Sequence, residues 1–462
     1  MGRYAIFVVF GLFLTMNYFL ISSHKSERIA IQSTVEHLNR RVAQNIATGY
    51  ANITLNRLRV DLVGVTGFEK DVYTLHRDLH RPEGAELDLF VDNFETDGAL
   101  EIGEYRITSR VDYEGESVET VVFDRQLPFS YWALFLNNFP SLYYGNGEGA
   151  DGPVHVNGKL GIGQNPGPQW MGNVTTTAGI KYYGGLSAGS YTGFHGDNNN
   201  FNHRGITMPT NLGLSLDAIK SSTKLDALFS GSTSSFLSVV LRRENGSGIQ
   251  YIDVKDIHPT DPRLNRAYWS HDWQWYNFLS QHTASIKLSS VTSGILYSRS
   301  FDLRVRGELD GQLTISTEQK MYIDDDIVYH DDPRTTPTSD DLLGLMAEDG
   351  MIVSTGQDPH TGFKYNNDYS THGAPYPGCT IMANMYTPST IQIENFRDGK
   401  RGDWTVVGGR VQETPSQTWT GSGNSWTGFK EVISYDDRLR KMTPPGIPYT
   451  MERRISRWVE TF

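Results

Sequence analysis

The sequence begins with the apolar stretch Tyr4-Ala-Ile-Phe-Val-Val-Phe-Gly-Leu-Phe-Leu-Thr-Met-Asn-Tyr-Phe-Leu-Ile-Ser22, which contains no charged residue. About twenty helical residues span a hydrocarbon core that is about 30 Å thick. The rest of the sequence is polar and rich in glycine. We therefore expect residues 1–23 to be a transmembrane anchor that holds a large polar body at a membrane.

A cleaved signal peptide is the alternative reading of this segment. Its apolar region is usually only about 7–15 residues long and follows a basic start. Here only Arg3 precedes the apolar stretch, and Ile21-Ser22-Ser23-His24 is a poor cleavage site. Glu27–Arg59 continues without proline and with apolar residues at roughly helical spacing. One long helix, half in lipid and half outside, fits the pattern best.

Composition limits the classes of function. The 462 residues allow two or three domains, and the net charge of −12 with interspersed signs argues against a nucleic-acid-binding surface. Cys379 is the only cysteine, which excludes an intrachain disulfide, a thiolate metal site and a redox pair. We expect a buried structural thiol there.

Residues 24–126 predict a small α+β unit. The runs 85–91, 104–113 and 117–123 alternate apolar and polar residues, and Glu114-Gly115-Glu116 separates the second from the third. Two alternating runs around a glycine turn predict a β-hairpin. The helix is expected to pack on this antiparallel sheet.

From residue 127 onward the predicted strands are very short and are separated by glycine or asparagine turns. Such a chain can wind as a solenoid in which each coil stacks on the last. We predict a mainly β fold with a parallel β-helix that starts at 127–194 and continues with a C-terminal cap at 286–462; a β-sandwich is the alternative. Residues 195–285 are predicted to form an inserted subdomain, with a hairpin of 236–243 and 248–254 around Asn245-Gly246.

Several motifs resemble a bacterial family of pilin-like envelope proteins of unassigned function. They include Phe129-Ser-Tyr-Trp-Ala-Leu-Phe135, Gly152-Pro-Val-His-Val-Asn-Gly158 and Tyr435-Asp-Asp-Arg438. Members of this family are similar to minor type IV pilus assembly proteins at the N-terminus and carry a β-helical domain after it. The resemblance implies a single-pass inner-membrane protein with its C-terminal body in the periplasm or at the cell surface. It also implies other pilin-like subunits as partners, in a type IV pilus or a type II secretion-like assembly.

The sequence departs from the prepilin pattern at one position. A prepilin has a glycine before its cleavage site and usually a glutamate five residues beyond it. Gly2 matches the glycine, but Phe7 stands at the fifth position. In the fibre that glutamate compensates a neighbouring N-terminal amine in apolar surroundings, where an unpaired charge is costly.

The densest acidic cluster gives a candidate metal site. Clustered carboxylate oxygens on a loop can bind calcium, although the spacing matches no calcium-loop motif. A solvated turn is the simpler interpretation. The candidate ligands are Asp324, Asp325, Asp326, Asp331 and Asp332.

An aromatic cluster gives a candidate glycan site, since Trp269, Trp273 and Trp275 could stack on sugar rings. Packing between the insertion and the solenoid explains them equally well. We identify no catalytic and no cofactor-binding residue, and we expect His155 to form hydrogen bonds within a turn.

The sequence thus favours a membrane-anchored structural or interaction protein of the cell envelope and not an enzyme. A carbohydrate-binding or polysaccharide-active protein on the same scaffold is the alternative.

Overall fold

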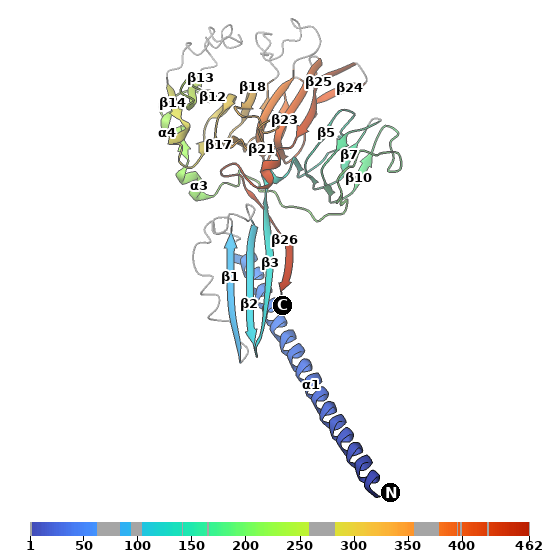
Figure 1. Cartoon of the computed structure of the whole chain (residues 1–462). Coiled ribbons are helices and arrows are strands. Elements are labelled where there is room, and N and C mark those ends of the chain that lie inside the picture. Colours follow the sequence, from blue (N-terminus) through green and yellow to red (C-terminus); the bar gives the residue numbers. More distant parts are fainter. Residues whose placement is uncertain are drawn as a thin grey trace. The chain divides into compact units, whose positions relative to one another are not determined.

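The computed structural model describes residues 2–61, 84–93, 104–140, 142–163, 166–257, 282–354, 378–394, 396–397, 400–422 and 425–461. The structure is mainly β with one long N-terminal helix, as predicted (Figure 1). The chain divides into two compact units. Unit 1 comprises Met1–Arg125 and Arg453–Phe462, and unit 2 comprises Gln126–Glu452.

Helix α1 (Gly2–Asp61) runs for 60 residues, and its C-terminal part packs on the sheet of unit 1. The packed face carries Ala43, Ala47, Ala51 and Leu55, spaced four residues apart, and all are at most 2% exposed. Residues four apart lie on one face of a helix. Their small side chains let the backbone of the helix approach the sheet closely.

The sheet of unit 1 has the strand order β1 (Ala85–Asn93), β2 (Glu104–Tyr113), β3 (Glu116–Pro128), β26 (Tyr449–Thr461). The predicted hairpin is confirmed, because Tyr113 pairs with Glu116. Glu114 and Gly115 both have positive φ, of 48° and 86°, as a two-residue type I′ turn requires. Strand β26 was not foreseen here, since the C-terminal residues were predicted to belong to the solenoid.

Unit 2 contains most of the strands, and many are only two to four residues long. Its helices are α3 (Leu216–Ser221) and α4 (Leu225–Leu228). The first strands are β4 (Leu134–Leu136), β5 (Gly149–Ala150), β6 (Val154–Val156), β7 (Leu160–Ile162), β8 (Gln169–Trp170), β9 (Val174–Thr176), β10 (Ile180–Tyr182), β11 (Thr223–Lys224), β12 (Phe236–Arg243), β13 (Gln250–Ile257) and β14 (Thr283–Lys287). The later ones are β15 (Ile295–Ser298), β16 (Asp302–Leu309), β17 (Gln312–Thr317), β18 (Met321–Tyr329), β19 (Leu342–Ala347), β20 (Met351–Val353), β21 (Cys379–Thr387), β22 (Ile391–Ile393), β23 (Lys400–Gln412), β24 (Trp419–Ser422) and β25 (Ser425–Ser434).

Alternate strands of unit 2 pair in parallel. One ladder runs β15, β17, β19, β21, β23, and a second runs β16, β18, β20, β22. Beyond β23 the first ladder continues with β4, β6 and β9, so residues from the start of unit 2 extend strands from its end. A further ladder joins β25, β5 and β8.

The segment 195–285 takes part in these ladders. The predicted hairpin forms, with β12 antiparallel to β13. In addition, β11 pairs in parallel with β15, and β12 pairs in parallel with β16. These strands therefore extend the two ladders, and the inserted subdomain stays a prediction.

The core of unit 2 runs along the ladders. The apolar positions of the predicted strands in 311–329 led us to expect Leu313, Ile315, Ile323 and Val328 in one continuous core. The first three are fully buried there. Val328 was predicted to be a core residue too, but it is only partly buried, and Ile327 takes the buried position. The buried positions of β18 are all odd-numbered, and Val328 lies on the opposite face. The pairing with β16 shifts register between Val305 and Gly307, but β18 gains two residues there, so the alternation is kept.

Candidate functional site

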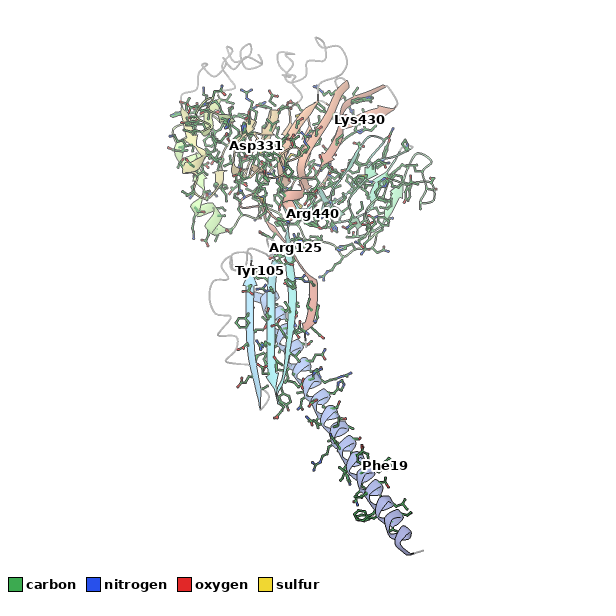
Figure 2. All side chains as sticks on the ribbon, in the orientation of Figure 1. Phe19, Tyr105, Arg125, Asp331, Lys430 and Arg440 are labelled. Carbon is green, nitrogen blue, oxygen red and sulfur yellow. The ribbon has the colours of Figure 1, made fainter. Side chains whose placement is uncertain are left out.

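The first candidate is the N-terminal part of α1, which no described residue of unit 1 covers. The large apolar side chains between Val8 and Ile21 are 51–72% exposed, and they include consecutive residues, so they surround the helix. Phe19 illustrates this arrangement (Figure 2). A helix that is apolar on all sides requires a membrane or other protein around it. Among the described residues, no helix is both long and apolar enough to cross a membrane.

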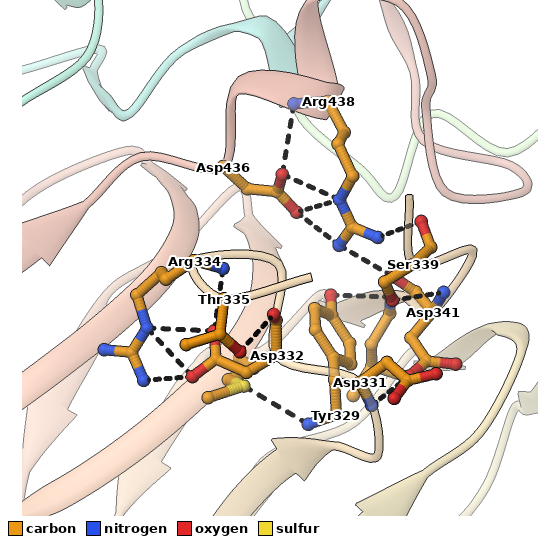
Figure 3. Close-up of polar contacts among 11 residues, drawn as sticks. Tyr329, Asp331, Asp332, Arg334, Thr335, Ser339, Asp341, Asp436 and Arg438 are labelled. Carbon is orange, nitrogen blue, oxygen red and sulfur yellow. Dashed lines mark hydrogen bonds and ion pairs between the residues drawn. The ribbon is translucent and has the colours of Figure 1, made fainter. Parts of the chain in front are cut away.

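The aspartates of the calcium hypothesis are held by protein groups. Arg304 binds Asp324 through two nitrogens, with Nη2 2.6 Å from Oδ1. Arg334 binds Asp332, with Nη2 2.6 Å from Oδ2 (Figure 3). No group of three or more histidine, cysteine, aspartate or glutamate side chains in the described ranges is placed to hold a metal ion.

The other three aspartates also have local contacts. The Asp325 carboxylate accepts a hydrogen bond from the backbone of Asp326 at 2.8 Å, and the Asp326 carboxylate accepts one from the backbone of Thr380 at 2.8 Å. The backbone N–H of Asp331 donates to Asp341 at 2.8 Å. These contacts are those of ordinary turns and strand edges, and calcium binding stays a prediction.

The remaining sequence candidates have different outcomes. Trp269, Trp273 and Trp275 lie outside the described residues. His155 lies fully buried in β6, with Nδ1 2.8 Å from the Thr175 hydroxyl and Nε2 2.9 Å from Asn157 Oδ1. It forms hydrogen bonds as expected, but the bond to Thr175 crosses to strand β9 and does not lie within a turn. The Cys379 thiol is buried as predicted, and burial raises its pKa.

A second candidate, which sequence reasoning missed, is a cavity of about 330 Å³ in unit 2. One wall is the loop between β4 and β5, and another is the segment 415–421, which leads into β24. The polar residues that line it include Tyr144, Glu148, Arg410 and Glu431, together with Ser416, Gln417, Thr418 and Thr420. We call this the polar cavity.

Strand register explains how these groups meet. Strand β25 pairs with β5 so that Val432 lies opposite Gly149, which places Glu431 beside Glu148. Strand β23 pairs with β25, with Trp404 opposite Glu431. Residues in register on parallel strands face the same side of a sheet. Three segments distant in sequence thereby contribute to one site.

A buried ion pair lies in the wall of the polar cavity. Arg410 Nη1 lies 2.7 Å from Glu431 Oε1, and the two side chains are 1% and 2% exposed. Arg410 also donates to the Tyr144 hydroxyl at 2.9 Å and lies 5.3 Å from the centre of the Trp404 ring. Its Nε has no hydrogen-bond partner among the described residues. Burial raises the pKa of Glu431, and the charge of Arg410 opposes that rise.

Glu148 is the titratable group of the polar cavity. Burial raises its pKa to about 7, and the charge of Glu431 adds to the rise. The Gly145 backbone N–H donates to Oε2 at 2.6 Å, and this bond and one from the Trp419 side chain oppose the rise. Near neutral pH the carboxyl can therefore either donate or accept a hydrogen bond.

Aromatic side chains border the polar cavity. Tyr143, 47% exposed, lies on the loop side, and Trp419 lies on the β24 side. Trp419 packs edge-on against Trp426 of β25 with ring centres 6.5 Å apart. The Lys430 ammonium lies 5.7 Å from the Trp419 ring centre. The arrangement combines apolar ring faces with hydrogen-bonding groups of both kinds, which is typical of a small-molecule binding site.

Comparisons with known proteins leave the function open. No protein-family model matches the sequence, and no curated protein matches it. Among solved structures, the chain is similar to the competence-associated pilin ComZ from Thermus thermophilus. The two share 10% identity, and the match covers 92% of this chain and 97% of that chain with a TM-score of 0.37. A likeness of this degree does not establish a shared function.

Proposed function

We propose that the chain is a membrane-anchored, pilin-like subunit of a cell-envelope assembly of the type IV pilus or type II secretion kind. In this proposal the apolar part of α1 lies in the inner membrane, with the body on its outer side. The parallel ladders of unit 2 wind as a β-solenoid that presents a long surface to partners.

The observation that carries the proposal is the exposed apolar collar of α1 between Val8 and Ile21. Burying one large aliphatic or aromatic side chain stabilises by about 1.5–3 kcal/mol. Eleven such side chains in this stretch are more than half exposed. Burying them against lipid or protein would therefore stabilise the helix considerably. Lipid or the corresponding helices of other subunits would supply the missing contacts.

The continuity of α1 supports a mechanical role. The same helix that carries the collar ends in the alanine face that packs on the sheet of unit 1. No glycine-rich or proline-rich linker intervenes between Val8 and Ala43. A force on the apolar end would therefore reach the folded body through hydrogen-bonded backbone.

Membrane fractionation of the full chain in bacterial cells tests the anchor. We expect the chain to resist carbonate extraction and a deletion of Met1–Ser22 to become soluble. Leu14→Arg places a charge in the middle of the collar, at a cost of about 2.5–3.5 kcal/mol, and should weaken membrane retention. The matched control Ser33→Arg, on an exposed helical position beyond the collar, should not. Release of the wild type from the membrane by carbonate would contradict the anchor. A mature chain that starts after residue 22 would contradict it as well.

Cysteine cross-linking tests the assembly separately. Because the natural cysteine is buried, a cysteine introduced at an exposed site is the accessible thiol. Leu38 is 57% exposed on α1, and Leu38→Cys should cross-link to a neighbouring subunit under mild oxidation in cells. The control Glu114→Cys, at the exposed β2–β3 turn, should cross-link much less. Equal cross-linking of both variants would argue against helix-mediated assembly.

A further inference from the structure

We propose that the polar cavity of unit 2 binds a neutral saccharide. This inference goes beyond the proposed assembly role, and it stands whether or not the helix enters a membrane. It also concerns residues distinct from Trp269, Trp273 and Trp275, on which the sequence placed glycan binding.

The size and walls of the polar cavity suit a sugar ring. A volume of about 330 Å³ lies at the lower end of the range for small-molecule sites. A sugar ring has an apolar face of C–H groups and an edge of hydroxyls. The aromatic rings of Trp419 and Tyr143 can pack on the C–H face of the sugar. The polar groups of the cavity can form hydrogen bonds with its hydroxyls.

The hydrogen-bonding groups are mixed in the way that hydroxyls require. A hydroxyl both donates and accepts. Glu148 and Glu431 supply acceptor oxygens, and Arg410 supplies N–H donors.

The charge balance favours a neutral ligand. Arg410 and Glu431 neutralise each other at 2.7 Å. An anionic ligand would meet the carboxylates of Glu148 and Glu431, and a cationic ligand would meet the guanidinium of Arg410. A polyhydroxylated neutral molecule has no such conflict with any of the three.

The test measures binding of neutral sugars to the full chain in lauryldimethylamine oxide, a detergent without a sugar headgroup. Glucose, galactose, N-acetylglucosamine, maltose, cellobiose and chitobiose serve as probes in saturation-transfer NMR and calorimetry at pH 6. We expect saturable binding of at least one probe. Trp419→Ala should weaken that binding by about tenfold or more, because it removes the ring that the sugar contacts.

Two further variants make the result specific. Trp426→Ala removes a tryptophan of the same hairpin that does not line the polar cavity, and it should bind within about threefold of wild type. Asp197→Asn changes an exposed carboxylate that does not line the polar cavity, and it should retain the affinity for a neutral ligand. The proposal is overturned if none of the six sugars binds, if Trp419→Ala binds as well as wild type, or if only charged probes such as glucuronate or putrescine bind.

Discussion

Replacing Glu148 by glutamine should stabilise unit 2 at alkaline pH. Burial raises the pKa of this carboxyl from 4.5 to about 7, so the folded state holds its proton more tightly than the unfolded state. The stability that this proton contributes is complete below about pH 4.5 and is lost as the pH rises through about 7. A shift of about 2.5 units, at 1.36 kcal/mol each, corresponds to roughly 3 kcal/mol.

The assay is urea unfolding of wild type and Glu148→Gln at pH 5, 6, 7 and 8, followed by tryptophan fluorescence. All tryptophans except Trp458 lie within the range of unit 2, so the signal reports mainly on that unit. We expect the two free energies of unfolding to be similar at pH 5, and the variant to be more stable by up to roughly 3 kcal/mol at pH 8. The control Asp197→Asn changes an exposed carboxylate and should show no such trend. A difference between wild type and Glu148→Gln that does not grow with pH would refute the reasoning.

Three further predictions concern the fold. Ile315 is fully buried, so Ile315→Ala should lower the free energy of unfolding by about 2–5 kcal/mol, and Ile315→Asp should prevent folding. If the Asp variant is as stable as wild type in urea, the strand assignment is wrong. Gly307→Ala should destabilise more than Gly115→Ala, since both have positive φ but only at Gly307 would a Cβ meet a backbone oxygen, at 2.1 Å; equal thermal shifts would contradict this. Ala47→Leu should cost about 1–3 kcal/mol by overfilling the helix–sheet contact, whereas Ala30→Leu on the exposed part of α1 should be neutral in the same melting assay.

Local pattern predicted the parts of the fold that depend on local chemistry. The apolar periodicity predicted α1, and the Glu114-Gly115 and Asn245-Gly246 turns predicted two hairpins. In each case the residues that decide the structure are neighbours in sequence. Both turns contain a glycine at a positive φ, Gly115 at 86° and Gly246 at 90°, where a side chain would be strained.

Pairing between distant strands could not be predicted in the same way. Nothing in the composition of 449–461 distinguishes a fourth strand of the first sheet from a cap of the second unit. The two extra residues that β18 places between Ile323 and Ile327, relative to β16, are another example. Such choices depend on the partner strand, which periodicity alone does not identify.

The polar cavity shows the same limit at the level of function. Glu148, Arg410 and Glu431 stand in three separate segments, and none belongs to a recognisable motif. Strand β23 pairs with β4, and strand β25 pairs with β5. These pairings bring the three residues together. A buried ion pair contributes little net stability, because desolvation offsets the attraction between the charges. The side chains of this cavity are therefore poorly explained by folding alone, and a ligand that uses their hydrogen-bonding groups gives a physical reason for burying them.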